Sequence, residues 1–265
     1  GRIAAIHAMS DIYAANAVPV WAMANVTLGM ARIDLQQHQL AQLMTGALLA
    51  LSEAGVQLVG GHTGESHDLS LGFAVTGWRE GPPTPPEADQ ETALILTKPL
   101  GTGVIMAAHM QLAARGDWVA AATTGMAHGN GKAAQILAQH NPAMTDVTGF
   151  GLARHALNLA ERCGRSGVEI DLAALPCLNG AMTLLEMGHR SSLHGQNKSA
   201  IMLAGDTPRA PGLDILFDPQ TSGGLLAVLP AADAISVVEQ LHTDGVKAAI
   251  VGRFDNTIPG LRVRS

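Results

Sequence analysis

The sequence predicts a globular chain of two domains that both mix helices with strands. The chain has 265 residues, which exceeds one domain of ordinary size. Hydrophobic residues make up 47% of it and charged residues 14%, so there is enough apolar material for packed cores. The stretch "REGPPTPPEADQ" holds four prolines, which continue neither a helix nor a sheet, and it predicts a domain boundary near residue 90. The expected domains are therefore 1–90 and 91–265.

The first domain is predicted from alternating helix and strand signals. Ala, Ile and Met favour a helix over 2–15, and β-forming residues favour a strand over 18–28. Apolar residues recur at helical spacing over 36–54. A strand over 56–59, a Gly-Gly turn with a polar loop, and a strand over 69–78 follow.

The second domain is predicted to begin with the strand "TALILTKPLG", to continue mainly as helices, and to end in mixed structure. The segment "TDVTGFG" (145–151) is expected to form a turn ahead of a helix. The predicted helices cover 103–114, 117–126, 131–140, 151–163 and 231–242, and the further strands cover 167–171, 213–217, 224–229 and 247–252.

Charge and composition exclude several classes of function. The net charge is -6 and basic residues are scattered singly, which argues against a nucleic-acid partner. No apolar run approaches the roughly 20 residues of a membrane span, and the first residues do not resemble a signal peptide. Cys163 and Cys177 are too far apart for a C-x-x-C pair, so a cytoplasmic location is expected.

The common phosphate and zinc motifs are absent. "HGNGKAA" lacks the first glycine and the hydroxyl residue of a P-loop, and "GTGVIM" lacks the last glycine of a dinucleotide-binding fingerprint. The 11 histidines show no zinc-ligand spacing.

Polar residues among small residues instead mark the candidate site. They occur in "AMSDIYA" (8–14), in "VGGHTGE" (59–65) and "TDVTGFG" (145–151), and in "DPQTSGGL" (218–225). Isolated aspartates beside glycine turns suit Mg²⁺, which keeps several waters and shares its shell with substrate phosphates. Glycine also lets backbone N–H groups approach a phosphate closely.

Each of these segments also has an ordinary structural explanation. Asp11 is explained as a surface residue of a helix, which is the more frequent use of such an aspartate. "VGGH" fits a turn at the end of a strand, and "DPQTSGG" fits a turn between a loop and a strand. Asp146 and Thr148 precede a helix and could cap it. Spacing alone does not decide between these explanations.

Taken together, the segments resemble selenophosphate synthetase (selenide, water dikinase). The resemblance is carried, in order, by "GRIAAIHAMSDIYA", "LVGGHT", "GFAVTG", "LTKPLGTGVI", "TDVTGFGL" and "DPQTSGGLL", and it covers most of the chain. The wording "GGHTGESHDLSLGFAVTG" is most similar to forms fused behind an oxidoreductase-like domain. The resemblance also implies that the chain is truncated at its N-terminus.

The resemblance implies a fold and a set of site residues. The fold is that of aminoimidazole ribonucleotide synthetase-like proteins, with an N-terminal α/β domain that pairs its sheet in a homodimer and a C-terminal α+β domain. Asp11 and Asp146 correspond to Mg²⁺ ligands. Asp11, Gly60, Gly61 and His62 correspond to ATP-binding residues, the last three as a turn that can serve the partner subunit's site.

The implied reaction converts ATP, selenide and water to selenophosphate, AMP and phosphate. The family's Cys or selenocysteine and its Lys would lie before residue 1, so the catalytic residues are unknown and the 265 residues alone are expected to be inactive. His7 stands where many relatives carry Asn. The alternatives are another ATP-dependent kinase of the same superfamily, such as a thiamine-monophosphate kinase-like protein, and a non-catalytic scaffold that binds nucleotide or dimerises.

Overall fold

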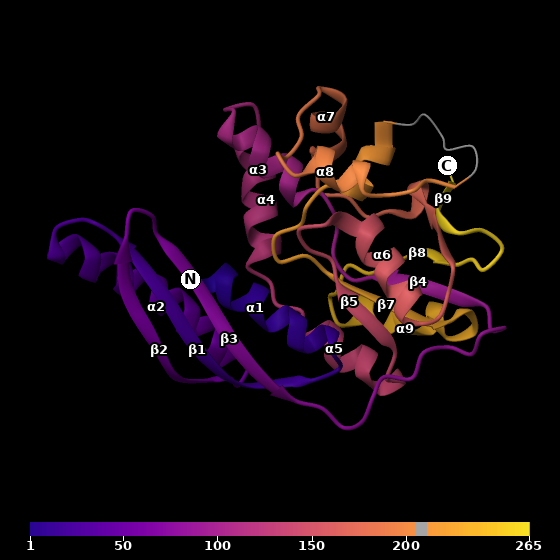
Figure 1. The fold of residues 1–265 in the computed structure, drawn as a ribbon, viewed down its shortest axis with the longest axis horizontal. Helices are drawn as coiled ribbons and strands as arrows, with labels where there is room; N and C mark the ends of the chain where they lie inside the picture. Colours follow the sequence, from indigo (N-terminus) through magenta and orange to yellow (C-terminus); the bar gives the residue numbers. More distant parts are fainter. Residues whose placement is uncertain (205–210, 265) are drawn as a thin grey trace.

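The chain folds around two sheets of different size. The computed structural model describes residues 1–204 and 211–264. The small-sheet unit spans residues 1–78 and the large-sheet unit spans residues 92–264, with residues 79–91 between them. Figure 1 shows the two units side by side, with the first helix lying between the small sheet and the larger unit.

The small-sheet unit holds three strands and two helices. In chain order these are α1 (Arg2–Ala14), β1 (Val18–Gly29), α2 (Ile33–Glu53), β2 (Gln57–Ser66) and β3 (Ser70–Trp78). The strand order is β2-β1-β3, with β2 parallel and β3 antiparallel to β1. The predicted helices over 2–15 and 36–54 and the strands over 18–28 and 69–78 are confirmed, with ends within three residues of those expected.

The two faces of the small sheet differ sharply. Ala22 and Val26 of β1 are buried against α1 and α2, because alternate residues of a strand point to one face. The other face has no covering helix among the described residues, and Trp21 and Met23 there are 50% and 51% exposed. The small sheet is therefore apolar on one face that solvent reaches.

The Gly-Gly turn expected at Gly60 and Gly61 is wrong. Both glycines, and His62 after them, lie within β2, which pairs with β1 through Met23 and Ala24. A Cβ atom at Gly61 would stand 2.2 Å from the carbonyl oxygen of Ala24, so the glycine is needed where the two backbones approach closely at a shift in register. The Gly-Gly pair was interpreted as a turn, but these glycines allow two paired strands to approach closely.

The large-sheet unit contains the remaining elements. Its strands are β4 (Thr92–Leu96), β5 (Ala143–Asp146), β6 (Gly167–Asp171), β7 (Leu225–Pro230), β8 (Ala249–Phe254) and β9 (Gly260–Arg264). Its α-helices are α3 (Thr102–Met110), α4 (Gly116–Met126), α5 (Gly131–Leu137), α6 (Gly151–Arg162), α7 (Ala181–Glu186), α8 (His194–Ser199) and α9 (Ala231–Thr243). Short 3₁₀ helices cover η1 (Ala138–His140), η2 (Leu172–Ala174) and η3 (Pro211–Phe217).

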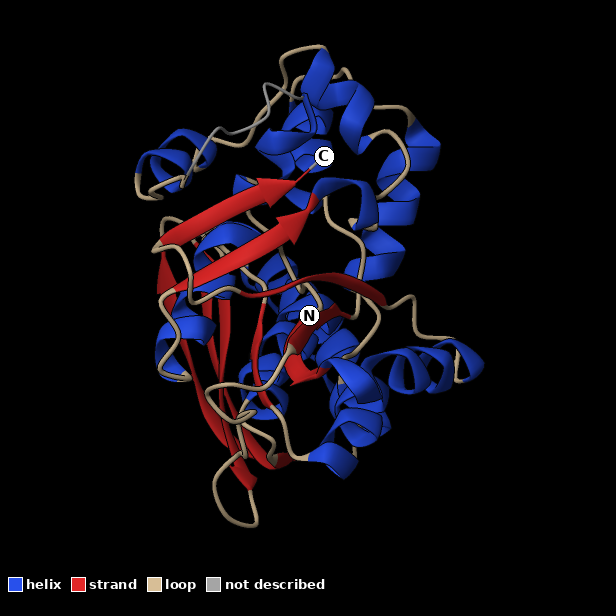
Figure 2. Ribbon diagram, turned by 90° about the vertical axis from the view of Figure 1, so that its right-hand side faces the viewer, coloured by secondary structure: helices blue, strands red, loops and turns tan. Residues whose placement is uncertain are grey.

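The large sheet has the strand order β5-β7-β4-β8-β6-β9 and is antiparallel except between β6 and β9. Its buried strands separate two cores. Leu94 and Leu226 face the core formed with α3, α4, α6 and α7, whereas Ile95 and Ala227 face the core formed with α5 and α9. Figure 2 shows helices around the strands of this unit. No helix within the described residues is long and apolar enough to cross a membrane.

Several elements of this unit differ from the prediction, which included neither the short helices α7 and α8 nor the strand β9. The apolar run 213–217 is the 3₁₀ helix η3 and not a strand, since a short continuous apolar run does not distinguish a strand from another buried segment. The strand β5 was missed because only four residues, ending at Asp146, pair with β7. So "TDVTGFG" begins as a strand and turns only afterwards.

The side chains of Asp218 and Gln220 close the start of α3. The Oε1 atom of Gln220 accepts hydrogen bonds from the N–H groups of Gly101 and Thr102 at 3.0 and 3.2 Å. Asp218 Oδ2 accepts one from the N–H of Gly103 at 3.1 Å. These are the N–H groups that a helix leaves unpaired at its start. The glycine-rich "PLGTGVI" therefore serves this connection, and the helix start is occupied by protein groups.

Asp218 is almost completely buried, with 1% of its surface exposed. Burial raises the pKa of its carboxyl group to about 7, although the hydrogen bonds from Gln220 and Gly103 act in the opposite direction. Its Oδ1 atom has no hydrogen-bond partner among the described residues.

We expect Gly61→Ala to lower the free energy of unfolding by on the order of 2 kcal/mol, because the added Cβ overlaps the backbone of Ala24. Gly60→Ala is the matched control. At Gly60 the nearest atom to an added Cβ is the sulfur of Met23 at 4.0 Å, so that variant should stay within about 0.5 kcal/mol of the wild type. Urea unfolding measures both. Equal effects of the two substitutions would contradict the close β1–β2 approach.

We expect Asp218 to make folding less favourable as the pH rises from about 4 to about 7. The unfolded chain releases this proton near the ordinary aspartate pKa of about 3.9, whereas the folded chain keeps it to about 7. The stabilisation is thus complete below the lower value and is lost as the pH passes the upper one. Asp218→Asn has no such proton, so the unfolding free energy of the wild type relative to this variant should fall across that window.

Urea unfolding at several pH values checks this, with Asp89→Asn, at an exposed aspartate, as the control that keeps the wild-type pH dependence. The same pH dependence in wild type and Asp218→Asn would contradict a protonated Asp218.

Candidate functional site

The structure brings Asp11 and Asp146 together from different units. Asp11 lies in the last turn of α1, and Asp146 is the final residue of β5, paired with Leu225 of β7. Although Asp11 keeps contact with solvent, partial burial and then the negative charge of Asp146 raise the pKa of its carboxyl group. The two carboxylates are therefore close enough to repel each other.

Asp146 is not a helix cap. The helix α6 begins at Gly151 after Phe150, and no side chain hydrogen-bonds to its first turn. Asp146 is buried, with 5% of its surface exposed, and the side-chain hydrogen bond at this residue goes to its backbone oxygen, from Thr145, and not to its carboxylate. Buried carboxylates are normally paired or hydrogen-bonded, so this one is available to a ligand.

Thr148 does not cap the helix either, because it bonds to His155 instead. The N–H group of Thr148 donates to His155 Nε2 at 3.1 Å. An imidazole that accepts at Nε2 carries its proton at Nδ1 when neutral. Burial lowers the pKa of His155 to about 4, while the charge of Asp11 acts in the opposite direction. A neutral imidazole thus holds the segment that follows Asp146.

The turn Thr221–Gly224 connects α1 with this site. The N–H of Ser222 donates to His7 Nδ1, one helical turn before Asp11, at 2.9 Å. The buried amide of Asn130 donates from Nδ2 to Ser10 Oγ at 3.0 Å and to the carbonyl oxygen of Gly223 at 2.8 Å. This turn is the "DPQTSGG" segment found in the sequence. Asn130 was missed, since its "HGNGKAA" was examined only as a failed P-loop.

The structure does not bring Gly60, Gly61 and His62 to the aspartates of the same chain. These three residues lie on β2, which packs against β1 and α2, whereas Asp11 lies on α1, which packs against α2, β1, β3, β5 and α5. Figure 1 shows β2 at the outer edge of the small sheet, on the side away from the large-sheet unit. Their part in ATP binding stays a prediction, and it requires a second copy of the chain.

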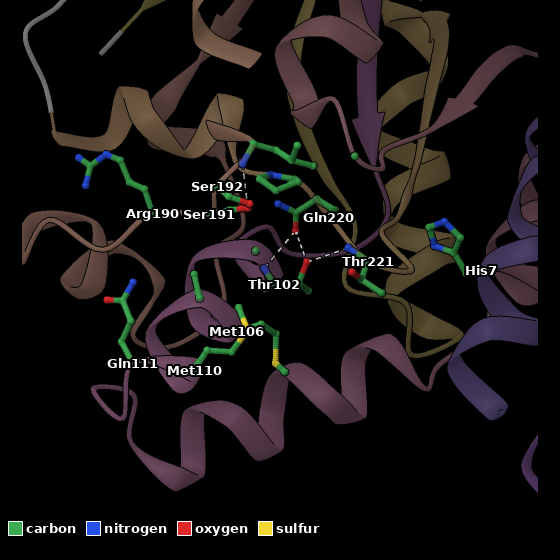
Figure 3. A pocket seen from close by; sticks show the side chains of 15 residues that line it. His7, Thr102, Met106, Met110, Gln111, Arg190, Ser191, Ser192, Gln220 and Thr221 are labelled. Carbon is green, nitrogen blue, oxygen red and sulfur yellow. Dashed lines mark hydrogen bonds between the residues drawn. The ribbon is translucent and has the colours of Figure 1, made fainter. Parts of the chain in front are cut away.

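A cleft of about 650 Å³ adjoins the site. Figure 3 shows it extending from Gln111 and Arg190 at one end to His7 at the other, with Met106 and Met110 of α3 along one wall. None of its lining residues is Asp or Glu, and Arg190 is already bound to Asp214, with 2.9 Å between Nε and Oδ2. The cleft therefore offers hydroxyl, amide and thioether groups, which suit a neutral or anionic ligand.

The donor set at the aspartates fits Mg²⁺. Two carboxylates that repel each other favour a divalent cation between them, and Mg²⁺ completes its shell with water and substrate phosphates. Among the described residues there is no group of three or more His, Cys, Asp or Glu side chains that could hold a metal by themselves. Cys163 and Cys177 are free thiols on other parts of the large-sheet unit.

Comparison with known proteins shows the family. Residues 1–78 match the N-terminal domain of AIR synthase related proteins, and residues 90–260 match the C-terminal domain. The selenide, water dikinase of Citrifermentans bemidjiense is 37% identical over 264 residues, covering 96% of this chain and 74% of that protein. That of Geobacter metallireducens is 38% identical over 266 residues, covering 95% and 74%.

A solved structure shows the same fold. The hydrogenase maturation protein HypE in complex with ATP superposes with a TM-score of 0.70 at 16% identity, covering 95% of this chain and 70% of that one. The two-domain aminoimidazole ribonucleotide synthetase-like fold expected from the sequence is thereby confirmed. The chain belongs to the selenide, water dikinase family of phosphotransferases.

Proposed function

We propose that this chain binds ATP for the synthesis of selenophosphate from ATP, selenide and water, with release of AMP and phosphate, and that Asp11 and Asp146 hold Mg²⁺ against the phosphates of ATP. The family membership supports the reaction. One observation supports the residues: α1, which carries Asp11, packs against β5, which ends at the buried Asp146, so two carboxylates meet from separate units. ATP in the HypE structure supports ATP as a substrate of this fold.

The residues of this chain have distinct tasks in this proposal. Asp11 and Asp146 bind the metal, which when bound neutralises charge on the transferring phosphoryl group. His155 stays neutral and holds the N–H group of Thr148, so the backbone after Asp146 keeps one orientation. His7 accepts from Ser222 and orients the turn of α1 that carries Asp11. Together they fix the site before substrate arrives.

We further propose that the small sheet pairs with a second copy of the chain. Its open face carries the exposed side chains of Trp21, Met23, Val59 and Trp78, and exposed apolar patches of this kind mark protein interfaces. Its outer strands β2 and β3 also have unpaired edges within one copy. A dimer would cover this face and could bring Gly60, Gly61 and His62 to the nucleotide of the partner.

The two reduced cysteines support a cytoplasmic location.

We expect Asp146→Asn to weaken Mg²⁺-dependent binding of ATP by on the order of tenfold or more, since losing a group that merely supports a metal ligand already has such an effect. The unfolding free energy should change little, because no described residue hydrogen-bonds to this carboxylate. Calorimetry with Mg-ATP and urea unfolding measure the two quantities. Asp117→Asn, an exposed aspartate on α4, is the control. Unchanged binding in Asp146→Asn would refute the metal role.

We expect Met23→Glu to separate the dimer, because two buried charges would face each other across the paired sheets. Light scattering at micromolar concentration measures the mass. Leu112→Glu is the matched control, since this leucine is 92% exposed on the large-sheet unit. A wild-type protein that is monomeric at high micromolar concentration would show that the sheet does not pair.

A further inference from the structure

The separation of the two aspartates depends on contacts between the two units, because no element carries both. Asp11 belongs to α1 of the small-sheet unit and Asp146 to β5 of the large-sheet unit. The carboxylates repel, so their positions in the metal-free protein must be fixed by other groups. The Thr221–Gly224 turn is placed to do this, since it bonds to both elements.

The turn contacts α1 and the end of β5 through one of its own backbone groups in each case. Towards α1, the N–H of Ser222 donates to His7 Nδ1 at 2.9 Å. Towards Asp146, the carbonyl oxygen of Gly224 accepts from the N–H of Val147 at 2.8 Å. A shift of the turn therefore moves α1 relative to the end of β5.

The turn has an unfavourable backbone conformation. Ser222 has a φ of 51°, which residues other than glycine rarely adopt, and its buried hydroxyl has no hydrogen-bond partner among the described residues. Gly223 lies so close to the next segment that an added Cβ would be 2.0 Å from the carbonyl oxygen of Val147. Such a conformation persists only where the surroundings hold it.

Lys98 is the charged group that holds it. Its Nζ atom donates to the carbonyl oxygen of Ser222 at 2.8 Å and to that of His128 at 2.6 Å. No described carboxylate forms an ion pair with this ammonium group. Burial lowers the pKa of Lys98 to about 8, although part of the residue still reaches solvent. An ammonium group whose two protein partners are backbone carbonyls fixes the positions of those carbonyls.

We propose that Lys98 is a positioning residue for the phosphoryl-transfer site, which clamps the Thr221–Gly224 turn and thereby sets the separation of Asp11 and Asp146. The role is mechanical: Lys98 touches neither aspartate in these contacts and acts through Ser222. This inference rests on the proposed Mg²⁺ role of the aspartates, and the clamp itself can be tested without metal.

The first test uses the ligand-free protein. Lys98→Met should speed hydrogen exchange at the backbone amides of Ser222 and Val147, because the carbonyl of Ser222 loses its donor and the turn moves more freely. Lys98→Arg keeps the charge and the donors, so it should restore part of the protection. Lys132→Met is the control, since Lys132 is exposed and pairs with Asp244. Wild-type protection at both amides in Lys98→Met would overturn the clamp.

The second test measures the Mg²⁺ concentration that gives half-maximal ATP binding. Lys98→Met should raise it by on the order of tenfold, the effect typical of groups that orient metal ligands. His7→Ala should raise it as well, and the double variant should show less than the product of the two effects, because both act through one turn. A loss of stability alone, with the Mg²⁺ requirement unchanged in folded Lys98→Met, would overturn the proposal.

The two tests distinguish a failure of the Lys98 proposal from a failure of the proposed function. If Lys98→Met does not fold, Lys98→Gln, which removes the charge, and His7→Ala carry the test, and an unchanged Mg²⁺ requirement in both overturns the proposal. If the wild type binds ATP without any need for Mg²⁺, the proposed function fails; the exchange data then still confirm or overturn the clamp as a structural element.

Discussion

The site depends on the contact between α1 and the large-sheet unit, since that contact holds two like charges near each other. Asn130 is central to it: the amide is buried, and it binds both Ser10 of α1 and the carbonyl of Gly223. A buried polar group with two such partners fixes geometry, because leaving either partner unpaired costs about 1–3 kcal/mol. The repulsion between Asp11 and Asp146 is thereby offset in the folded chain before a metal binds.

Much of the fold could be predicted because its signals are local. The helical spacing of apolar residues in α2 and the alternation in β1 follow directly from burial on one face. The predictions that were wrong concern segments whose conformation depends on contacts with residues distant in the sequence. The β2 strand runs through Gly60 and Gly61 only because β1 lies beside it, and η3 is an apolar run whose partners decide its conformation.

In the candidate site, too, some residues could be found from the sequence and others only from contacts in the fold. Asp11 and Asp146 were found by their small neighbours and by resemblance, and the structure places them together. Lys98 and Asn130 carry no local signal, because their roles come from the carbonyl groups of His128, Ser222 and Gly223, which are distant in the sequence. The capping explanation of Asp146 failed because the chain forms a strand up to that residue and the helix starts five residues later.

The segment between the two units also limits how the molecule can move. Residues 79–91 carry four prolines, and Asn141 binds the segment at both Pro82 and Thr84. At the same time α1 bonds to the larger unit at Arg2, His7 and Ser10, along most of its length. A hinge opening would have to break all of these contacts at once, which makes domain rotation costly. The two units are therefore expected to move together as one rigid body in the folded protein.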